Sequence, residues 1–188
     1  MRTIILEVAA QLIERHDIRG FILPGNSGTT ARAFRDRFGP AYQYTAVGNL
    51  PMAHERGYVH HSGMTEETKA ELERLGFTVV LQEVSAFQPM NSSPVFAEHA
   101  RRMQSSYEMA VENPEIQIKG TSLSWIVEHT LRALFDEQVK TCVEICLMAG
   151  ESEKIDHKAK YISIGTPSRW SSDFRDCAVV VTPSTSGT

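Results

Sequence analysis

The sequence has no long hydrophobic run, few cysteines and no excess of basic residues. No apolar stretch approaches the roughly 18 residues that a membrane-spanning helix needs, so we expect no membrane contact. The 3 cysteines are odd in number and too few for a disulfide framework, which favours a reducing compartment and predicts a cytoplasmic protein. The 19 basic and 23 acidic residues give a net charge of −4, with no Lys/Arg run, so we predict no nucleic-acid partner.

The composition that remains fits one globular domain. The 188 residues are 41% hydrophobic and 22% charged, which permits a sizeable core and argues against disorder. The N-terminal segment MRTIILEVAAQLIER mixes acidic and basic residues and lacks a small-residue cleavage site, so it predicts a folded helix rather than a secretion signal. Because the sequence contains no repeat, low-complexity tract or linker, we predict a single domain over residues 1–188.

Helical and strand patterns alternate along the chain. The predicted helices cover roughly residues 3–16, 29–39, 66–76, 94–110 and 123–135, and the predicted strands roughly residues 21–24, 42–47, 77–81, 161–164 and 178–181. Residues 139–148 are apolar enough for either a buried helix or a strand. Strands separated by helices indicate a mostly parallel sheet between two helical layers, so the predicted fold is a three-layer α/β/α domain.

The most informative segment is the turn PGNSGTT between a buried strand and a helix. Gly25 and Gly28 allow close approach of the backbone to a ligand. The free N–H groups at the start of the helix, with the hydroxyls of Ser27, Thr29 and Thr30, predict a phosphate site. An ordinary helix N-terminus without a ligand is the alternative interpretation.

Three sharper motifs are incomplete in this turn. The Walker loop requires a lysine that is absent, and the dinucleotide fingerprint requires three spaced glycines. The nucleophile elbow G-x-S-x-G requires a second glycine at position 29, whereas Gly28 lies one residue early. A hydrolase with Ser27 as nucleophile is therefore a secondary hypothesis, since it also requires a histidine base and a carboxylate.

A second candidate loop follows the strand at residues 161–164. It offers the hydroxyls of Thr166 and Ser168 and the guanidinium of Arg169, which can chelate a phosphate with two hydrogen bonds. If this strand neighbours the strand at 21–24, both loops meet where the strand order reverses, and ligands collect at such points. We therefore expect Gly165, Thr166, Ser168 and Arg169 to border the same pocket.

His60 and His61 form a third candidate, in the stretch YVHHSG. Adjacent residues on an extended backbone point to opposite sides, so the two imidazoles do not suit one metal ion. Each could contact a ligand or transfer a proton near neutral pH, or lie in a loop without such a role. No complete set of metal ligands is visible in the sequence, so we predict no metal.

Cys142 and Cys146 are four residues apart, hence on one face of a helix if the segment is helical. Two thiols make half of a zinc site, and no matching pair completes it, so core packing is the favoured interpretation. Glu144 is the odd residue in this apolar run. Two readings stay open for Glu144: exposure at a helix end, or burial with a partner that ties the segment to the ligand loops.

Several of these segments resemble one known family. The segments SGTTA at 27–31, HHSG at 60–63, TCVEI at 141–145 and the tail from 160 resemble uncharacterised stand-alone proteins with a pyruvate kinase C-terminal-like α/β domain. The resemblance implies a five-stranded sheet of order 3-2-1-4-5 whose last strand is antiparallel. It also implies that residues 139–148 are helical and that strands one and four are neighbours.

The resemblance also implies a ligand. Stand-alone relatives are associated with flavin mononucleotide (FMN), whose phosphate suits the turn after the first strand. The site residues expected on this basis are Ser27, Gly28, Thr29 and Thr30 at the phosphate, Arg169 as counter-charge, Gly165, Thr166 and Ser168 in the closing loop, and His60, His61 and Gly63 along the distal part. Pyruvate kinase activity does not follow, because the catalytic barrel of that enzyme is absent from these residues.

The sequence thus predicts a protein that binds a phosphorylated small molecule, with FMN as the cofactor, and leaves open whether it is an enzyme. A non-catalytic metabolite-sensing or assembly module is the alternative. We expect a homo-oligomer, because symmetric self-association is the default among such domains.

Overall fold

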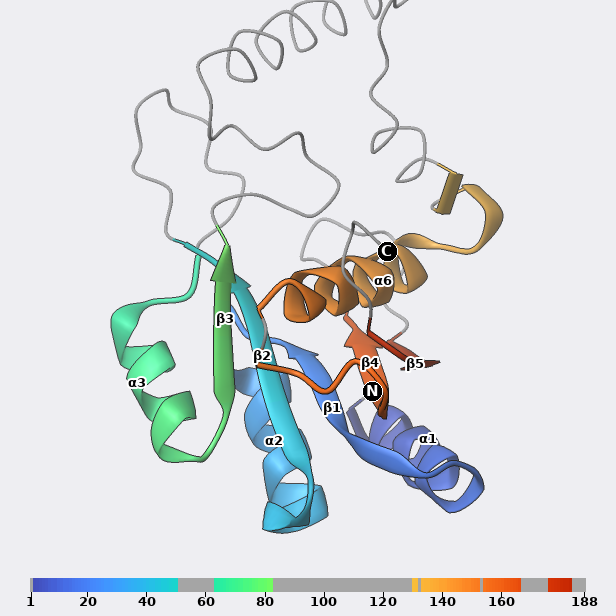
Figure 1. Cartoon of the computed structure of the whole chain (residues 1–188), viewed down its shortest axis with the longest axis horizontal. Helices are drawn as coiled ribbons and strands as arrows, with labels where there is room; N and C mark the ends of the chain where they lie inside the picture. The colour runs from blue at the N-terminus through green and yellow to red at the C-terminus, as the bar shows by residue number, and fades with distance from the viewer. Residues whose placement is uncertain are drawn as a thin grey trace, which may run out of the picture.

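The computed structural model describes residues 2–50, 63–82, 130–131, 133–152, 154–166 and 176–183. Its centre is a five-stranded sheet of order β3-β2-β1-β4-β5 (Figure 1). The first four strands in chain order are parallel, and β5 runs antiparallel to β4. The expected order, the antiparallel last strand and the adjacency of strands one and four are all confirmed.

The strands extend slightly beyond the predicted apolar runs. They are β1 (Ile18–Pro24), β2 (Gln43–Asn49), β3 (Thr78–Gln82), β4 (Lys160–Gly165) and β5 (Cys177–Val181). The largest difference is in β1, which begins at Ile18 rather than Phe21. Its first residues include the exposed Arg19 and the buried Gly20, which precede the apolar run. Gly20 nevertheless pairs with residues of both β2 and β4, so tertiary pairing extends the strand.

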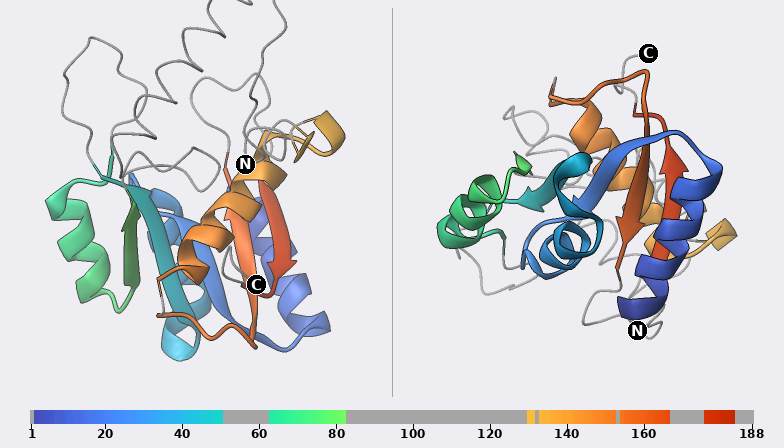
Figure 2. Two further views of the ribbon diagram at one scale, coloured as in Figure 1. Left: turned by 45° about the horizontal axis from the view of Figure 1, so that its top comes forward. Right: turned by 90° about the horizontal axis from the view of Figure 1, so that it is seen from below.

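The helices cover both faces of the sheet. They are α1 (Arg2–Arg15), α2 (Thr29–Phe38), α3 (Glu66–Arg74) and α6 (Glu137–Gly150), with a short 3-10 turn η1 (Gly39–Ala41) after α2. Among the described helices, α6 alone covers one face, while α1, α2 and α3 lie on the other (Figure 2). Residues 139–148, for which the apolar pattern left two options, are helical within α6.

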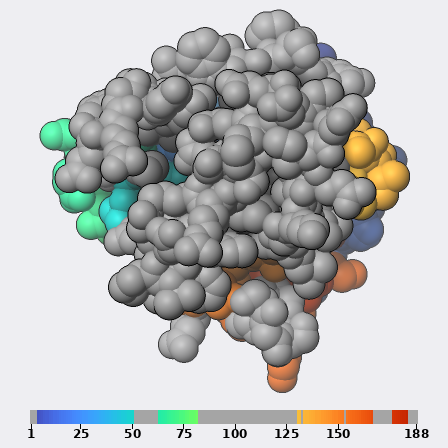
Figure 3. All heavy atoms as spheres, turned by 90° about the horizontal axis from the view of Figure 1, so that it is seen from above, coloured from blue at the N-terminus to red at the C-terminus, as the bar shows by residue number. Residues whose placement is uncertain are grey.

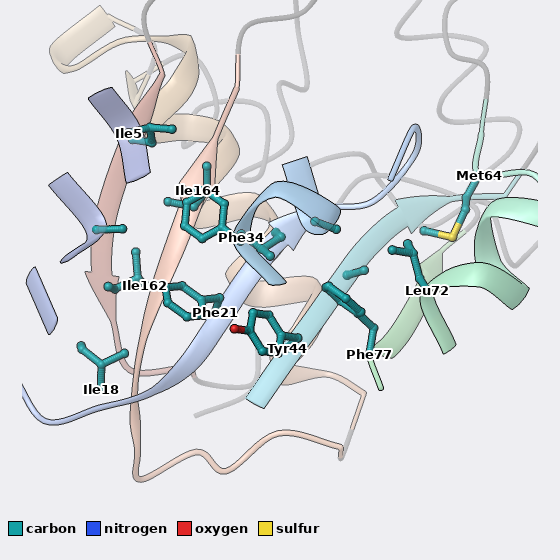
Figure 4. Close-up of a cluster of buried hydrophobic side chains, with 14 residues drawn as sticks. Ile5, Ile18, Phe21, Phe34, Tyr44, Met64, Leu72, Phe77, Ile162 and Ile164 are labelled. Carbon is teal, nitrogen blue, oxygen red and sulfur yellow. The ribbon is translucent and has the colours of Figure 1, made fainter. Parts of the chain in front are cut away.

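The face under α1, α2 and α3 holds an aromatic core (Figure 4). Phe21 of β1 is fully buried, and its ring centroid lies 5.3 Å from that of Phe34 and 5.5 Å from that of Tyr44. Burial raises the pKa of Tyr44, whose hydroxyl donates to Gly39 O at 2.6 Å. These contacts fix α2 over the centre of the sheet and set the direction in which it leaves β1.

The face under α6 is packed differently, with small side chains and thiols. Cys146 and Ala149 are buried there in a cluster with Ile22 and Tyr161, and the buried Cys142 packs against Ser163 of β4. Both cysteines therefore pack in the core, as the sequence suggested. The described residues contain no group of His, Cys, Asp and Glu able to hold a metal ion.

The helices predicted at 94–110 and 123–135 are not confirmed in full. The helix expected at 94–110 and most of that at 123–135 lie outside the described residues. Residues 130, 131, 133 and 134 are helical, but Leu134 and Phe135 are 70% and 63% exposed, so the apolar face predicted there is wrong at its end. Among the described residues, each helix is too short or too polar to span a membrane.

Candidate functional site

The candidate site lies at the edge where the four parallel strands end, at Pro24, Asn49, Gln82 and Gly165. Because β1 and β4 are paired, the turn after Pro24 and the loop after Gly165 start side by side. Seen onto this edge, α3 lies on one side and the residues leading into α6 on the other (Figure 3). The strand order reverses between β1 and β4, and this is where open α/β sheets bind ligands.

The turn after β1 is shaped by Gly28, the residue just before α2. Gly28 has φ 66°, a left-handed conformation that costs an L-residue with a Cβ about 1–2 kcal/mol. Its N–H donates to Gly25 O at 3.0 Å, which closes the turn. A Cβ at this position would also lie 2.7 Å from Nη1 of Arg32. The backbone conformation therefore favours glycine, and a larger residue would also have to displace the end of the Arg32 side chain.

Within the described part of the chain, α2, α3 and α6 begin at this edge, and their first turns differ. Thr65 Oγ1 caps α3 by accepting from Thr68 N at 3.2 Å, and Asp136 Oδ1 caps α6 by accepting from Val139 N at 2.7 Å. In contrast, α2 has no side-chain cap hydrogen bond at Gly28. The nearest side-chain acceptor in the described turn is Ser27 Oγ, 3.4 Å from Thr29 N, which is too long for a strong bond.

The charged residues in the first turn also distinguish α2 from α3 and α6. The first turn of α3 contains Glu66 and Glu67, and that of α6 contains Glu137, whereas that of α2 contains no acidic residue. Hydrogen bonds from its own backbone N–H and from Thr65 lower the pKa of Glu67, so α3 binds a carboxylate of its own. The start of α2 has the same partial positive charge, its first turn contains no acidic side chain, and the Glu71 carboxylate of α3 is paired with Arg32.

Arg32, one turn into α2, adds a full positive charge beside this turn. Its Nη1 donates to Glu71 Oε2 of α3 at 2.9 Å, and its Nη2 donates to the carbonyl oxygen of Ser27 at 3.1 Å. Both side chains of the ion pair are about one-third exposed. Arg32 was not among the residues predicted for the site, although a cation so near a helix N-terminus is unfavourable for the helix dipole and can therefore indicate another role.

Asn26 and Met64 join the turn to the end of β2. Asn26 Oδ1 accepts from Asn49 N at 2.9 Å, and Met64 N donates to Asn49 O at 2.9 Å. The buried Met64 packs over Gly25. This contact brings the buried Gly63, expected along the distal part of the pocket, to the same edge as the turn. Neither side chain was singled out from the sequence, because the contacts cross between separate strands.

Gly165 allows α6 to approach the end of β4. A Cβ at position 165 would collide with the carbonyl oxygen of Gln138 and would lie 3.1 Å from Cys142 Sγ. Ser163 Oγ donates to the Cys142 carbonyl at 2.8 Å, which fastens the helix to the strand. The structure therefore places Gly165 beneath α6 and Thr166 at the point where the loop leaves the sheet.

The structure places some of the remaining candidate residues, while others lie outside the described ranges. Glu144 accepts from Lys140 Nζ at 2.8 Å, and its side chain is 13% exposed, so it is buried with a partner. Ser168, Arg169, His60 and His61 lie outside the described residues. Ser27 is exposed, and within the described ranges no histidine or carboxylate is bonded to its hydroxyl.

Comparison with known proteins does not add a family to this geometry. No protein-family model matches the chain, and no curated protein is significantly similar to it. The functional argument therefore depends on the residues at the edge of the sheet.

Proposed function

We propose that the chain binds a phosphorylated small molecule, with FMN as the ligand, at the carboxyl edge of β1 and β4. The observation that carries the proposal is the start of α2. Of the described helices that begin at this edge, α2 alone has neither a side-chain cap nor an acidic residue in its first turn. Like α6, it begins beside the point where the strand order reverses.

A phosphate dianion suits this position. The N–H groups of Thr29, Thr30 and Ala31 precede the first helical hydrogen bond, which runs from Arg32 N to Gly28 O at 2.9 Å. Phosphate oxygens can accept from these groups and from the hydroxyls of Ser27, Thr29 and Thr30. Arg32 lies beside this position, where its guanidinium is paired with Glu71 and also donates to the carbonyl oxygen of Ser27.

The flavin part of the proposal rests on the resemblance to the pyruvate kinase C-terminal-like family. The strand order 3-2-1-4-5 with an antiparallel last strand agrees with that family's expected fold. In this proposal Gly63, Gly165 and Thr166 border the pocket, while His60, His61, Ser168 and Arg169 complete it.

The test is a binding titration of the purified chain with FMN, riboflavin and inorganic phosphate, followed by flavin fluorescence and preceded by an absorbance spectrum. We expect FMN to bind at least about tenfold more tightly than riboflavin, because one charge-assisted phosphate contact contributes about 1.5–3 kcal/mol. Inorganic phosphate should compete with FMN but not with riboflavin.

The controls separate the two parts of the proposal. A colourless preparation that fails to bind added FMN contradicts the flavin assignment. Failure of inorganic phosphate to protect the turn as well, measured by amide exchange at Thr29 and Thr30, contradicts the phosphate site itself. Equal affinity for FMN and riboflavin would likewise place the phosphate away from α2.

A further inference from the structure

The Cys142 thiol approaches Cys177 beside the loop that follows β4. Along β5, Ala178 and Val180 pack on the aromatic side of the sheet, while Val181 packs under α6. Because successive strand residues point to opposite faces, Cys177 lies on the α6 side with Val181. Cys142 reaches the same place from α6.

The contacts bring these two residues within reach of each other. Cys142 Sγ lies 3.4 Å from the carbonyl oxygen of Ser163 and 3.8 Å from that of Cys177. Cys177 is the pairing partner of Gly165, which has no side chain to separate the two thiols. Cys146, one turn along α6, packs instead with Ile22 and Tyr161.

The two thiols differ in exposure and acidity. Cys142 is fully buried, whereas Cys177 is half-buried at the edge strand. A hydrogen bond from Cys142 lowers the pKa of Cys177, and burial and the Asp136 carboxylate oppose this effect. The same hydrogen bond, followed by burial, raises the pKa of Cys142. Cys177 is thus the thiol that ionises first and that a reagent reaches first.

We propose that Cys142 and Cys177 form an oxidisable dithiol, which a small-molecule disulfide such as glutathione disulfide converts into an intramolecular disulfide. The Cys177 thiolate attacks one sulfur of the reagent, forms a mixed disulfide and releases one glutathione thiolate, which takes up a proton. The Cys142 thiol then loses its proton, attacks the Cys177 sulfur and releases the second glutathione. The protein loses two electrons, and the reagent is reduced to two thiols.

The product would fasten α6 to the first residue of β5. The loop between Gly165 and Cys177 begins and ends at paired residues, and Cys142 lies next to both of them. The disulfide therefore fixes the base of the loop that carries Thr166, Ser168 and Arg169. This inference does not depend on ligand binding, since it concerns only the described thiols and their neighbours.

The test is oxidation of the intact chain in glutathione redox buffers, followed by thiol counting and peptide mapping. Of the 3 cysteines, we expect Cys142 and Cys177 to be linked and Cys146 to stay reduced. Cys146→Ser should still form the link, while Cys142→Ala and Cys177→Ser should not. Before oxidation, iodoacetamide should modify Cys177 at least about tenfold faster than Cys142.

Several results would overturn the proposal. These are a link that involves Cys146, a link between two chains, a mixed disulfide that remains on Cys177, or no thiol loss in excess oxidant. Because mapping of the unmodified sequence already decides among them, the conclusion does not depend on the folding of any variant. Cys142→Ala should also slow the alkylation of Cys177, and an unchanged rate would show that the two thiols are not in contact.

Discussion

The two helices that flank the β1–β4 junction, α2 and α6, begin at the same edge of the sheet in opposite ways. Gly28 leads into α2 without a side-chain cap, whereas Asp136 caps α6 with a 2.7 Å hydrogen bond to Val139 N. They also pack differently. The inner face of α2 places Phe34 against Phe21, while α6 approaches the sheet through Cys142 and Gly165.

The difference separates a helix start that is closed by its own carboxylate from one that has no side-chain cap. A carboxylate at a helix start satisfies the free N–H groups and neutralises the local dipole, so the start of α6 needs nothing further. The start of α2 has the same electrostatic character with no internal partner of that kind. The proposal that an external anion binds at α2 therefore depends on the comparison of the two helix starts.

The largest expected effect comes from closing α2 with a charge of its own. Ser27→Asp places a carboxylate where we propose the phosphate, and it should weaken FMN binding about a hundredfold through like-charge repulsion and lost hydrogen bonds. Gln11→Glu adds the same charge on the exposed surface of α1 and should leave the affinity unchanged. Titration by flavin fluorescence measures both, and an unchanged affinity in Ser27→Asp would move the site elsewhere.

The second prediction concerns the thiol packing under α6. Burial raises the pKa of Cys146 from 9.0 to about 11, so the folded state retains a proton that the unfolded state loses. The stability from this group is complete below pH 9 and falls as the pH rises to 11, by about 2–3 kcal/mol. Urea unfolding across this range should show the loss, and Cys146→Ala should flatten it. If the free energy of unfolding falls equally with pH in the natural chain and in Cys146→Ala, the burial of the Cys146 thiol is not the cause.

The third change tests the left-handed turn before α2. Gly28→Ala should lower the free energy of unfolding by about 1–2 kcal/mol, because alanine is strained at this φ and its Cβ approaches Arg32. Gly28→Asn should cost less, since asparagine adopts this conformation more readily. Urea unfolding compares the variants, and an alanine variant as stable as the natural chain would show that the turn is not fixed as described.

The smallest effect should come from removing the caps. Asp136→Ala should destabilise the chain by about 1 kcal/mol, because it leaves the first N–H groups of α6 without their acceptor. Thr65→Ala should have a similar effect at α3. Ser27→Ala is the matched change at α2, and because its hydroxyl is 3.4 Å from Thr29 N it should cost less than either. A larger cost for Ser27→Ala in thermal unfolding would mean that α2 is capped after all.

Much of the fold follows from local patterns. The apolar run Phe21–Leu23 between breakers predicts a buried central strand, and Thr65 followed by two glutamates predicts the start of α3. The same patterns do not fix strand ends, as Ile18 shows, because pairing with neighbours extends β1 through the exposed Arg19. Leu134 and Phe135 have helical spacing but are exposed, so periodicity alone did not locate the core there.

Some features of the candidate site could also be predicted from the local sequence, and others could not. The turn from Gly25 to Thr30 was recognisable because glycine and hydroxyl residues between a strand and a helix suit a phosphate. Arg32, Asn26 and Met64 act at this turn through contacts with Glu71, Asn49 and Gly25, residues distant in the sequence. No local pattern encodes these contacts. The proximity of Cys142 to Cys177 also depends on the pairing of β4 with β5.

The sequence by itself determined the alternation of helices and strands, the glycine-rich turn after the first strand and the cap of α3, because these depend on neighbours within a few residues. Only the tertiary structure decided that β1 lies beside β4, that Arg32 is held by Glu71, and that Cys142 approaches Cys177. The physical reason is range: hydrophobic periodicity and capping act over one or two turns, whereas sheet pairing joins segments more than a hundred residues apart, as in Phe21 opposite Ile162.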